Sequence, residues 1–369
     1  MKIAVIFGGP SPEHDISILT GLQVLRTLIS KYEVVSIYWT KSGNYLLIPN
    51  DLEPADFLED LSKKGIPLSF RVTESGGFYD VSSRLSKKEK KLEFDSLVNC
   101  CHGGPGESGA LQGALDICSL NYTGPNLSYA LLGMDKLSFG LLMKSTGIET
   151  LERYFLDDSV DSLPFGGPYI VKPRFGGSSI GIDVVADLAT AKSRLSSNIH
   201  LKAGAVIEPY RDDLYDIQIA VKSYPTLMLS AIERPLKRNM TNEILSYKDK
   251  YLPGQGMEGA SRELPANLDQ KIADKIRNAA VLASKVLAVR GISRFDFMVN
   301  ETEVYINEVN TIPGSLSRYM FVDPKVEFIE LLEDMIAESR INHQQHYSTQ
   351  GADGSALKNA ESVASKLMY

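Results

Sequence analysis

Three cysteines are few for a chain of 369 residues, and their positions exclude a fold held together by disulfides. Cys100 and Cys101 are adjacent and Cys118 stands alone, so there is no CxxC pair with the spacing of zinc ligands. We therefore expect reduced thiols, as is usual in the cytoplasm.

Long apolar runs are also missing, and none approaches the roughly 18 residues that a membrane span requires. The first apolar run, residues 3–7, ends at Gly8, Gly9 and Pro10 and is too short for a signal peptide. The sequence thus predicts a cytoplasmic protein with no membrane partner.

Positive charge is in deficit, because 39 Lys and Arg residues stand against 46 Asp and Glu residues, a net charge of −7. Binding to nucleic acid requires a basic surface that neutralises phosphates, so no nucleic-acid partner is expected. A local basic pocket for a small phosphate compound remains compatible with this charge. Two familiar nucleotide-binding patterns are missing: no GxGxxG follows the first strand, and no GK[ST] follows the later glycine loop.

What is present is an ordinary globular composition, 43% hydrophobic and 23% charged, in a chain long enough for two or three subdomains. Residues 3–7, 17–30 and 32–38 are typical of strand, helix and strand, an α/β opening that implies a parallel sheet. Residues 41–93 are polar and predict irregular, solvated surface. A further strand at 94–101 leads into a glycine loop.

The remaining chain alternates between apolar segments and loops. The expected elements are a helix at 131–147, strands at 169–172, 180–185, 205–209, 216–221 and 226–233, a helix at 268–287, and strands at 291–299 and 303–308. Residues 239–265 hold few apolar side chains and several Gly and Pro, which favours a long loop of the kind that often covers an active site. The tail at 341–369 is polar.

The most informative pattern is a pair of short segments, RFDF at 294–297 and NEVN at 307–310. Residues two apart on a strand share a face, so Arg294 points with Asp296, and Glu308 with Asn310. Carboxylate and amide oxygens from neighbouring strands suit magnesium with bound phosphates. Either segment alone could equally be an edge strand with its charges in solvent; together, and followed by a sharp turn at Gly314, they favour the metal site.

A second pattern, KPRFGGSSIG at 172–181, joins Lys172 to a Gly/Ser loop whose backbone N–H groups could cradle phosphate oxygens. An ordinary hairpin turn is the alternative. Lys248 and Lys250 in the long loop could close over the phosphates, or could be plain surface charge.

Two further candidates follow N-terminal strands. Glu13, in GGPSPEH, would repel a phosphate but suits the ammonium group of a substrate. His102, in HGGPG, lies at the strand edge where parallel sheets collect ligands, although a lone loop histidine can also be incidental.

Taken in order, these segments resemble the D-alanine–D-alanine ligase family over about residues 1–325. The similar stretches are GGPSPEHDIS, CHGGPGESGALQGALD, YTGP, MDK, VKPRFGGSSIG, KDKY, RFDF and NEVNTIPG. The resemblance implies an ATP-grasp fold behind an N-terminal Rossmann-like domain with a parallel sheet. Its expected divisions are an N-terminal domain at 1–131, a central subdomain at 132–213, a C-terminal subdomain at 214–340 with a lid at 239–265, and a tail without counterpart.

The resemblance also implies roles for the matching residues. Lys136, Lys172 and Lys250 would contact the phosphates of ATP, and a loop with Gly176, Gly177 and Ser179 would cover them. Glu208 would bind the adenine and Asp216 the ribose. Two magnesium ions, replaceable by manganese, would be held by Asp296, Glu308 and Asn310. Glu13 would bind the ammonium group of the first D-alanine and form a hydrogen-bonded set with Ser178 and Tyr251. Arg294 and the Gly314 N–H would stabilise the tetrahedral intermediate. His102 would lie near the acceptor, and Ser317 would bind the acceptor's carboxylate.

The implied activity is ATP-dependent joining of two D-alanines through an acyl phosphate, for peptidoglycan synthesis, by a cytoplasmic homodimer. Two departures bear on it: the segment after Gly314 is about two residues shorter than is typical, and the ribose position holds Asp216 where Glu is usual. They leave open a related dipeptide ligase with a different acceptor amino acid, although Tyr251 fits D-alanine better than a hydroxy acid. A nucleotide-binding regulator without catalysis is the other alternative; it would have lost the residues of the metal pattern, and all are present.

Overall fold

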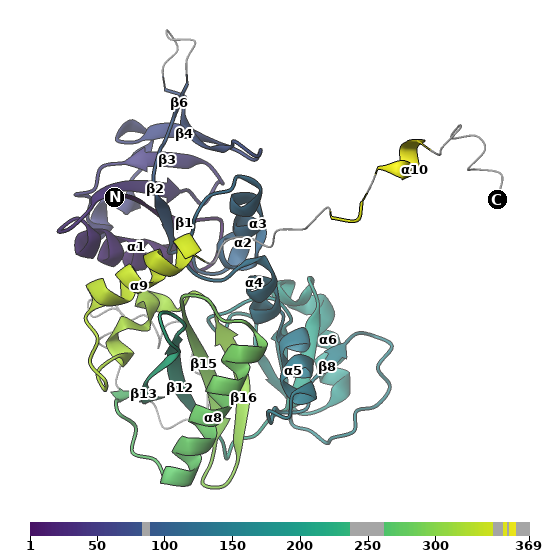
Figure 1. The fold of residues 1–369 in the computed structure, drawn as a ribbon. Helices are drawn as coiled ribbons and strands as arrows, with labels where there is room; N and C mark the ends of the chain where they lie inside the picture. The colour runs from purple at the N-terminus through teal and green to yellow at the C-terminus, as the bar shows by residue number, and fades with distance from the viewer. Residues whose placement is uncertain (83–88, 237–261, 342–349, 353, 359–369) are drawn as a thin grey trace.

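The computed structural model describes residues 1–82, 89–236, 262–341, 350–352 and 354–358 (Figure 1). Lys248, Lys250, Tyr251 and most of the predicted lid and tail lie outside the described residues. Within them the chain forms three sheets, one in each predicted range. No helix in this part of the chain is both long and apolar enough to cross a membrane.

The N-terminal sheet has seven strands in the order β6-β5-β4-β3-β2-β1-β7. β1 pairs in parallel with β2 and β7, as the sequence predicts, and β3 to β6 continue the sheet antiparallel. The strands are β1 (Lys2–Gly8), β2 (Glu33–Trp39), β3 (Tyr45–Ile48), β4 (Ile66–Arg71), β5 (Gly77–Asp80), β6 (Lys90–Lys91) and β7 (Ser96–Asn99). The prediction of irregular surface at 41–93 is therefore wrong. Each added strand is too short for its apolar alternation to stand out in the sequence.

Helix α1 (His14–Leu28) packs directly on β1. A Cβ atom added at Gly21 would lie 2.4 Å from the Phe7 ring, so only glycine allows this close approach. The helix begins three residues before the predicted start at residue 17. Shorter helices follow, namely η1 (Pro54–Leu58), η2 (Leu61–Lys63), α2 (Gly104–Glu107) and α3 (Ala110–Ile117).

The single helix predicted at 131–147 is two helices, α4 (Leu127–Met134) and α5 (Lys136–Ser145). Asp135 separates them with an extended backbone, and its carboxylate caps α5 by accepting from the N–H groups of Leu137 at 3.1 Å and Ser138 at 3.2 Å. Apolar residues continue across the break, so periodicity alone could not reveal it.

The central sheet has the order β10-β9-β11-β8 and the C-terminal sheet the order β14-β13-β12-β15-β16, both antiparallel. The central elements are β8 (Tyr154–Leu156), β9 (Tyr169–Pro173), β10 (Asp183–Val185), α6 (Leu188–Ser197), η3 (Ile199–Leu201) and β11 (Ala205–Pro209). The C-terminal elements are β12 (Tyr215–Lys222), β13 (Met228–Pro235), β14 (Arg262–Glu263), α8 (Gln270–Val286), β15 (Ile292–Val299) and β16 (Val304–Asn310). These bounds confirm the predicted strands and helix within a few residues.

The end of the chain returns to the N-terminal sheet. η5 (Gly314–Met320) and α9 (Phe328–Ile341) follow β16, and α10 (Ser355–Lys358) lies beyond them. Leu316 and Leu331 share one apolar cluster with Val5 and Leu25, and α9 lies beside α1 in Figure 1. The loop after β16 is thereby held between the C-terminal and N-terminal sheets, where it can build a site from both.

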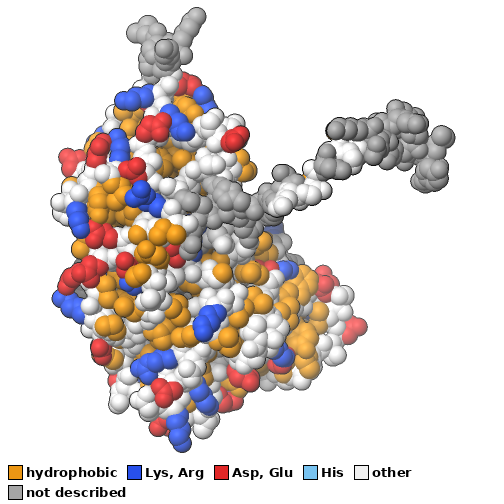
Figure 2. Space-filling model, in the orientation of Figure 1, with side chains coloured by type: hydrophobic (Ala, Val, Ile, Leu, Met, Phe, Trp, Pro, Cys, Tyr) orange, Lys and Arg blue, Asp and Glu red, His pale blue; other side chains and the backbone are white. Residues whose placement is uncertain are grey.

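Charge is scattered over the face of the molecule that Figure 2 shows. On the face drawn in Figure 2, Lys and Arg side chains are interspersed with Asp and Glu side chains. The groups of opposite charge that matter for chemistry are instead concentrated inside, between the sheets.

Candidate active site

The acid-bearing strands β15 and β16 pair with Asp296 opposite Glu308 and Arg294 opposite Asn310. Arg294 donates to both carboxylate oxygens of Asp296, at 2.7 Å from Nε and 2.9 Å from Nη2. Asn310 Nδ2 donates to Asp296 Oδ2 at 3.2 Å. The predicted convergence of these side chains is confirmed.

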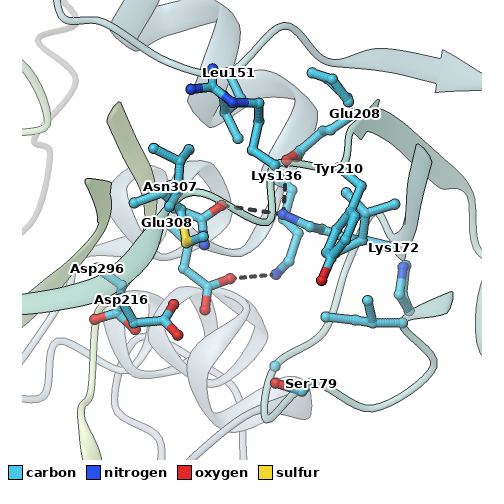
Figure 3. A pocket seen from close by; sticks show the side chains of 18 of the residues that line it. Lys136, Leu151, Lys172, Ser179, Glu208, Tyr210, Asp216, Asp296, Asn307 and Glu308 are labelled. Atoms are coloured by element: carbon cyan, nitrogen blue, oxygen red, sulfur yellow. Dashed lines mark hydrogen bonds and ion pairs between the residues drawn. The ribbon is translucent and has the colours of Figure 1, made fainter. Parts of the chain in front are cut away.

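Each carboxylate of this group already faces a cation. Asp296 is paired with Arg294, and Lys136 Nζ lies 3.0 Å from Glu308 Oε2 (Figure 3). Lys136 also donates to Gly176 O at 2.7 Å. A cation or phosphate that enters here must therefore exchange with existing ion pairs.

The same residues fit magnesium. In the described part of the chain no three His, Cys, Asp or Glu side chains gather as a metal site. The candidate set holds two carboxylates and one amide, Asp296, Glu308 and Asn310, which are oxygen ligands of the kind that magnesium prefers. Magnesium keeps several waters or phosphate oxygens in its shell, so an incomplete protein set is what a shared metal–phosphate site requires.

A pocket lies between the central and C-terminal sheets and collects most of the predicted nucleotide residues (Figure 3). Ile170, Ile182, Leu214 and Met298 supply apolar wall. The predicted residues that line it are Lys136, Lys172, Gly176, Gly177, Ser179, Glu208, Asp216, Asp296 and Glu308. The pocket thus combines apolar surface for a base with cations and glycine loops for phosphates.

At the inner end of the pocket, Glu208 is fully buried between two cations. Lys172 Nζ donates to Glu208 Oε2 at 2.8 Å, and Arg153 Nε lies 3.1 Å from Oε1. Burial would raise the pKa of Glu208, but the charges of Arg153 and Lys172 outweigh it and lower that pKa. Glu208 is therefore ionised, and its Oε1 has no well-aligned hydrogen bond within the described residues.

Arg153 is a residue that sequence reasoning missed. It is buried, and besides Glu208 it donates to the backbone oxygens of Lys136 at 2.6 Å and Asn307 at 3.1 Å. It therefore connects the start of α5, the pocket and strand β16. No local pattern around residue 153 could have signalled this, since its partners are 17, 55 and 154 residues away.

The Gly/Ser loop closes the pocket toward the N-terminal sheet. Ser178 and Ser179 have positive φ angles of 53° and 58°, and Ser178 Oγ donates to the carboxylate of Glu13. The predicted pairing of Glu13 with Ser178 is confirmed, whereas Tyr251 lies outside the described residues. Arg174 in the same loop forms an ion pair with the α5 cap Asp135, a second pair that sequence reasoning missed, although an Asp before a helix start is a usual capping signal.

His102 is buried close enough to Glu13 to feel its charge. Its Nδ1 lies 2.6 Å from Ile312 O and its Nε2 lies 2.7 Å from Thr20 Oγ1. Burial lowers the pKa of His102, and the nearby charge of Glu13 opposes this only in part. The imidazole is therefore neutral at pH 7.

Gly314 begins η5, and Ser317 in the same segment is completely buried. Ser317 Oγ has no hydrogen-bond partner among the described residues. Glu107, which was also missed, fastens this region by accepting from the N–H groups of Gly103 at 2.8 Å and Ile312 at 3.0 Å.

Two family models together match most of the chain. Residues 2–125 match the D-ala D-ala ligase N-terminus and residues 132–337 match the D-ala D-ala ligase C-terminus. This chain belongs to the D-alanine–D-alanine ligase family. Membership makes it a ligase that uses ATP and small-molecule substrates.

Individual relatives cover nearly the whole chain. The D-alanine–D-alanine ligase of Campylobacter jejuni subsp. doylei is 29% identical over 361 residues, 96% of this chain and 99% of that protein. The D-alanine–D-alanine ligase of a Nitratiruptor species is 32% identical over 339 residues, 91% of this chain and 93% of its own.

Solved structures confirm the predicted ATP-grasp fold. The crystal structure of the Helicobacter pylori D-alanine–D-alanine ligase has a TM-score of 0.73 at 28% identity and covers 92% of this chain and 98% of its own. The VanG D-Ala:D-Ser ligase of Enterococcus faecalis, with a TM-score of 0.76 at 23% identity, covers 92% and 99% and shares the fold.

Proposed function

We propose that this enzyme joins two D-alanine molecules into D-alanyl-D-alanine, with ATP converted to ADP and phosphate, for peptidoglycan synthesis in the cytoplasm. The observation that carries the proposal is the pocket in which Lys136, Lys172, Glu208 and Glu308 meet beside the Glu13–Ser178 pair. Curated relatives across the whole chain are named for the same reaction.

In the proposed reaction the pocket holds ATP, with Glu208 at the adenine, Asp216 at the ribose and Lys136, Lys172 and the Gly176–Ser179 loop at the phosphates. Glu208 Oε1 is a buried, ionised acceptor, which suits the exocyclic amine of adenine. Lys136 and Lys172 exchange their carboxylate partners for phosphate oxygens, and the freed Glu308 becomes available as a metal ligand. Lys250 and Tyr251 keep their predicted roles at the phosphates and in the Glu13 set.

Magnesium held by Asp296, Glu308 and Asn310 would neutralise negative charge on the transferring phosphoryl group. Glu13 binds the ammonium group of the first D-alanine and so directs its carboxylate toward the γ-phosphate. Lys136 stabilises the charge that develops as the acyl phosphate forms. Water would hydrolyse this intermediate, so the reaction requires a site that is closed to solvent while the intermediate exists.

In the second step the neutral amine of the acceptor attacks the acyl phosphate and phosphate leaves. Arg294 and the Gly314 N–H stabilise the oxyanion of the tetrahedral intermediate. Arg294 is suited to this because it is buried and Asp296 orients it through two hydrogen bonds, one to each carboxylate oxygen. We also propose the domain limits 1–131, 132–213 and 214–340 and a homodimer, as the family resemblance implies.

A substrate panel tests the proposal. ADP release would be measured with single D- and L-amino acids and with pairs that combine D-alanine with a second amino acid, and each product would be identified by mass. We expect turnover with D-alanine alone and a product of two D-alanines. If D-alanine turns over only together with another amino acid, the enzyme is the related ligase with a different acceptor.

A further inference from the structure

The segment after Gly314 is held in an unusual backbone conformation. Ser315, Leu316 and Ser317 have φ angles of 50°, 48° and 50° and ψ angles between 22° and 32°. This left-handed region is unfavourable for residues with a side chain, so three in succession persist only where surrounding contacts hold them. The contacts that hold this turn therefore decide the shape of the site that it lines.

One such contact comes from helix α1, almost 300 residues earlier in the chain. The N–H of Ser315 donates to Thr20 Oγ1 at 3.0 Å, and Thr20 is 1% exposed. Thr20 Oγ1 also lies 2.7 Å from His102 Nε2, and His102 Nδ1 lies 2.6 Å from Ile312 O. A continuous line of buried hydrogen bonds thus joins α1, the His102 loop and both sides of Gly314.

The protons in this line follow from the chemistry of its groups. A carbonyl oxygen only accepts, so His102 Nδ1 must carry a hydrogen and donate it to Ile312 O. In the neutral ring Nε2 is then an acceptor, and the Thr20 hydroxyl donates to it. Thr20 Oγ1 still has a lone pair for the Ser315 N–H. Every group is satisfied, and neither imidazole nitrogen has a free position for a substrate proton.

This line runs beside the reacting groups. A Cβ added at Gly103, next to His102, would lie 2.6 Å from Glu13 Oε2, so the His102 loop touches the proposed donor site. On its other side the turn ends at Ser317, whose buried Oγ has no hydrogen-bond partner within the described residues. Glu107 secures the same loop by accepting from Thr311 Oγ1 and the Ile312 N–H, both at 3.0 Å.

We infer that Thr20 and His102 are positioning residues for the acceptor amino acid. They hold the left-handed turn at Ser315–Ser317 in the conformation that receives the acceptor. His102 acts as a link in this line of hydrogen bonds and transfers no proton to or from a substrate. The inference rests on the proposed ligase function and adds to it the residues that set its acceptor subsite.

Kinetics of Thr20→Val and Thr20→Ser test the inference, with saturation by D-alanine resolved into a donor and an acceptor KM. Thr20→Val keeps the side-chain shape but removes the hydroxyl, so the Ser315 N–H loses its acceptor and His102 Nε2 loses its donor. We expect its acceptor KM to rise by roughly tenfold or more, since loss of a single buried hydrogen bond corresponds to about tenfold, with the donor KM and the ATP KM within about twofold of wild type. Thr20→Ser restores the hydroxyl and should return the acceptor KM to within about threefold.

Thr27→Val is the matched control, because Thr27 lies on the same helix and its hydroxyl donates only to Gln23 O, one turn back. It should leave all three constants unchanged. An unchanged acceptor KM in Thr20→Val, or an equal rise of all three constants, would overturn the inference.

Nitrogen NMR of His102 in the wild-type enzyme gives a second readout that does not depend on any variant folding. We expect a neutral ring with its hydrogen on Nδ1 at pH 7; a hydrogen on Nε2 or a charged ring contradicts the line of donors. If the wild-type enzyme makes no product from D-alanine, the proposed function fails, and the Thr20 variants are then compared with the acceptor that the substrate panel identifies.

Discussion

Glu107 should make the stability of this protein depend on pH in an unusual direction. Its carboxylate is buried, and burial raises its pKa from 4.5 to about 7, with the charge of Glu13 acting in the same sense. Hydrogen bonds from Gly103, Ile312 and Thr311 oppose this rise without cancelling it. The folded protein therefore holds a proton on Glu107 at a pH where the unfolded chain has released it.

The sign and size of the effect follow from linkage. Between pH 4.5 and 7 the folded state binds more protons than the unfolded state at this group, so stability falls as pH rises. The contribution is complete below pH 4.5 and lost once pH exceeds about 7. A difference of about 2.5 between the two pKa values, at about 1.4 kcal/mol for each unit, corresponds to about 3 kcal/mol.

Glu107→Gln tests this without emptying the site. Glutamine keeps an oxygen for the Ile312 N–H but cannot ionise, so its free energy of unfolding should lack this pH dependence. Thermal unfolding of both proteins would be followed from pH 4.5 to 8. The difference between their Tm values should shift in favour of the variant by roughly 4 °C as pH rises, because an unfolding entropy of about 2.1 cal/mol/K per residue makes each kcal/mol worth about 1.3 °C in a chain of 369 residues.

The absolute Tm of the variant does not test the prediction, because the introduced glutamine faces the Gly103 N–H with an amide group and loses that hydrogen bond at every pH. The test is how the Tm of each protein changes with pH. Parallel curves for wild type and Glu107→Gln would refute the reasoning, and the exposed Glu330→Gln variant should run parallel to wild type.

Three further outcomes are expected. Glu308→Ala should abolish ATP turnover by removing a proposed metal ligand, and near-normal ADP release would overturn the metal assignment. Arg153→Met should lower the Tm by an amount equivalent to about 3 kcal/mol, because it leaves the buried Glu208 with one counter-charge. Combining it with Glu208→Gln should recover part of that loss. A double variant no more stable than Arg153→Met would argue against the ion pair. Asp135→Asn keeps the helix cap but weakens the ion pair with Arg174, which we expect to cost about 1–2 kcal/mol at pH 7. Burial opposes ionisation of Asp135, but Arg174 and Ser138 outweigh it and lower its pKa, so urea unfolding should show this advantage of wild type vanishing as pH falls below about 4.

The sequence by itself determined the family, the α/β class and the residues of the two most specific patterns. RFDF and NEVN are short, and residues two apart on a strand share a face whatever the rest of the fold does, so Arg294, Asp296 and Asn310 could be placed together in advance. The Gly/Ser loop after Lys172 could also be predicted from the sequence, because the conformation of such a loop depends mainly on neighbouring residues. The sequence did not predict the short strands at 41–93, because each is too brief for its apolar alternation to stand out. It did not predict the helix break at Asp135, because apolar residues continue across it.

Tertiary structure alone decided which charges and donors meet. Arg153 with Glu208, Lys136 with Glu308, and Thr20 with His102 and Ser315 join residues separated by 55, 172, 82 and 295 positions. No periodicity links such distant positions, and nothing in the sequence around each of these residues shows that its polar side chain will be buried away from water. Burial then leaves each polar group dependent on one partner, and that physical requirement, invisible in the order of residues, shapes the pocket and the turn after Gly314.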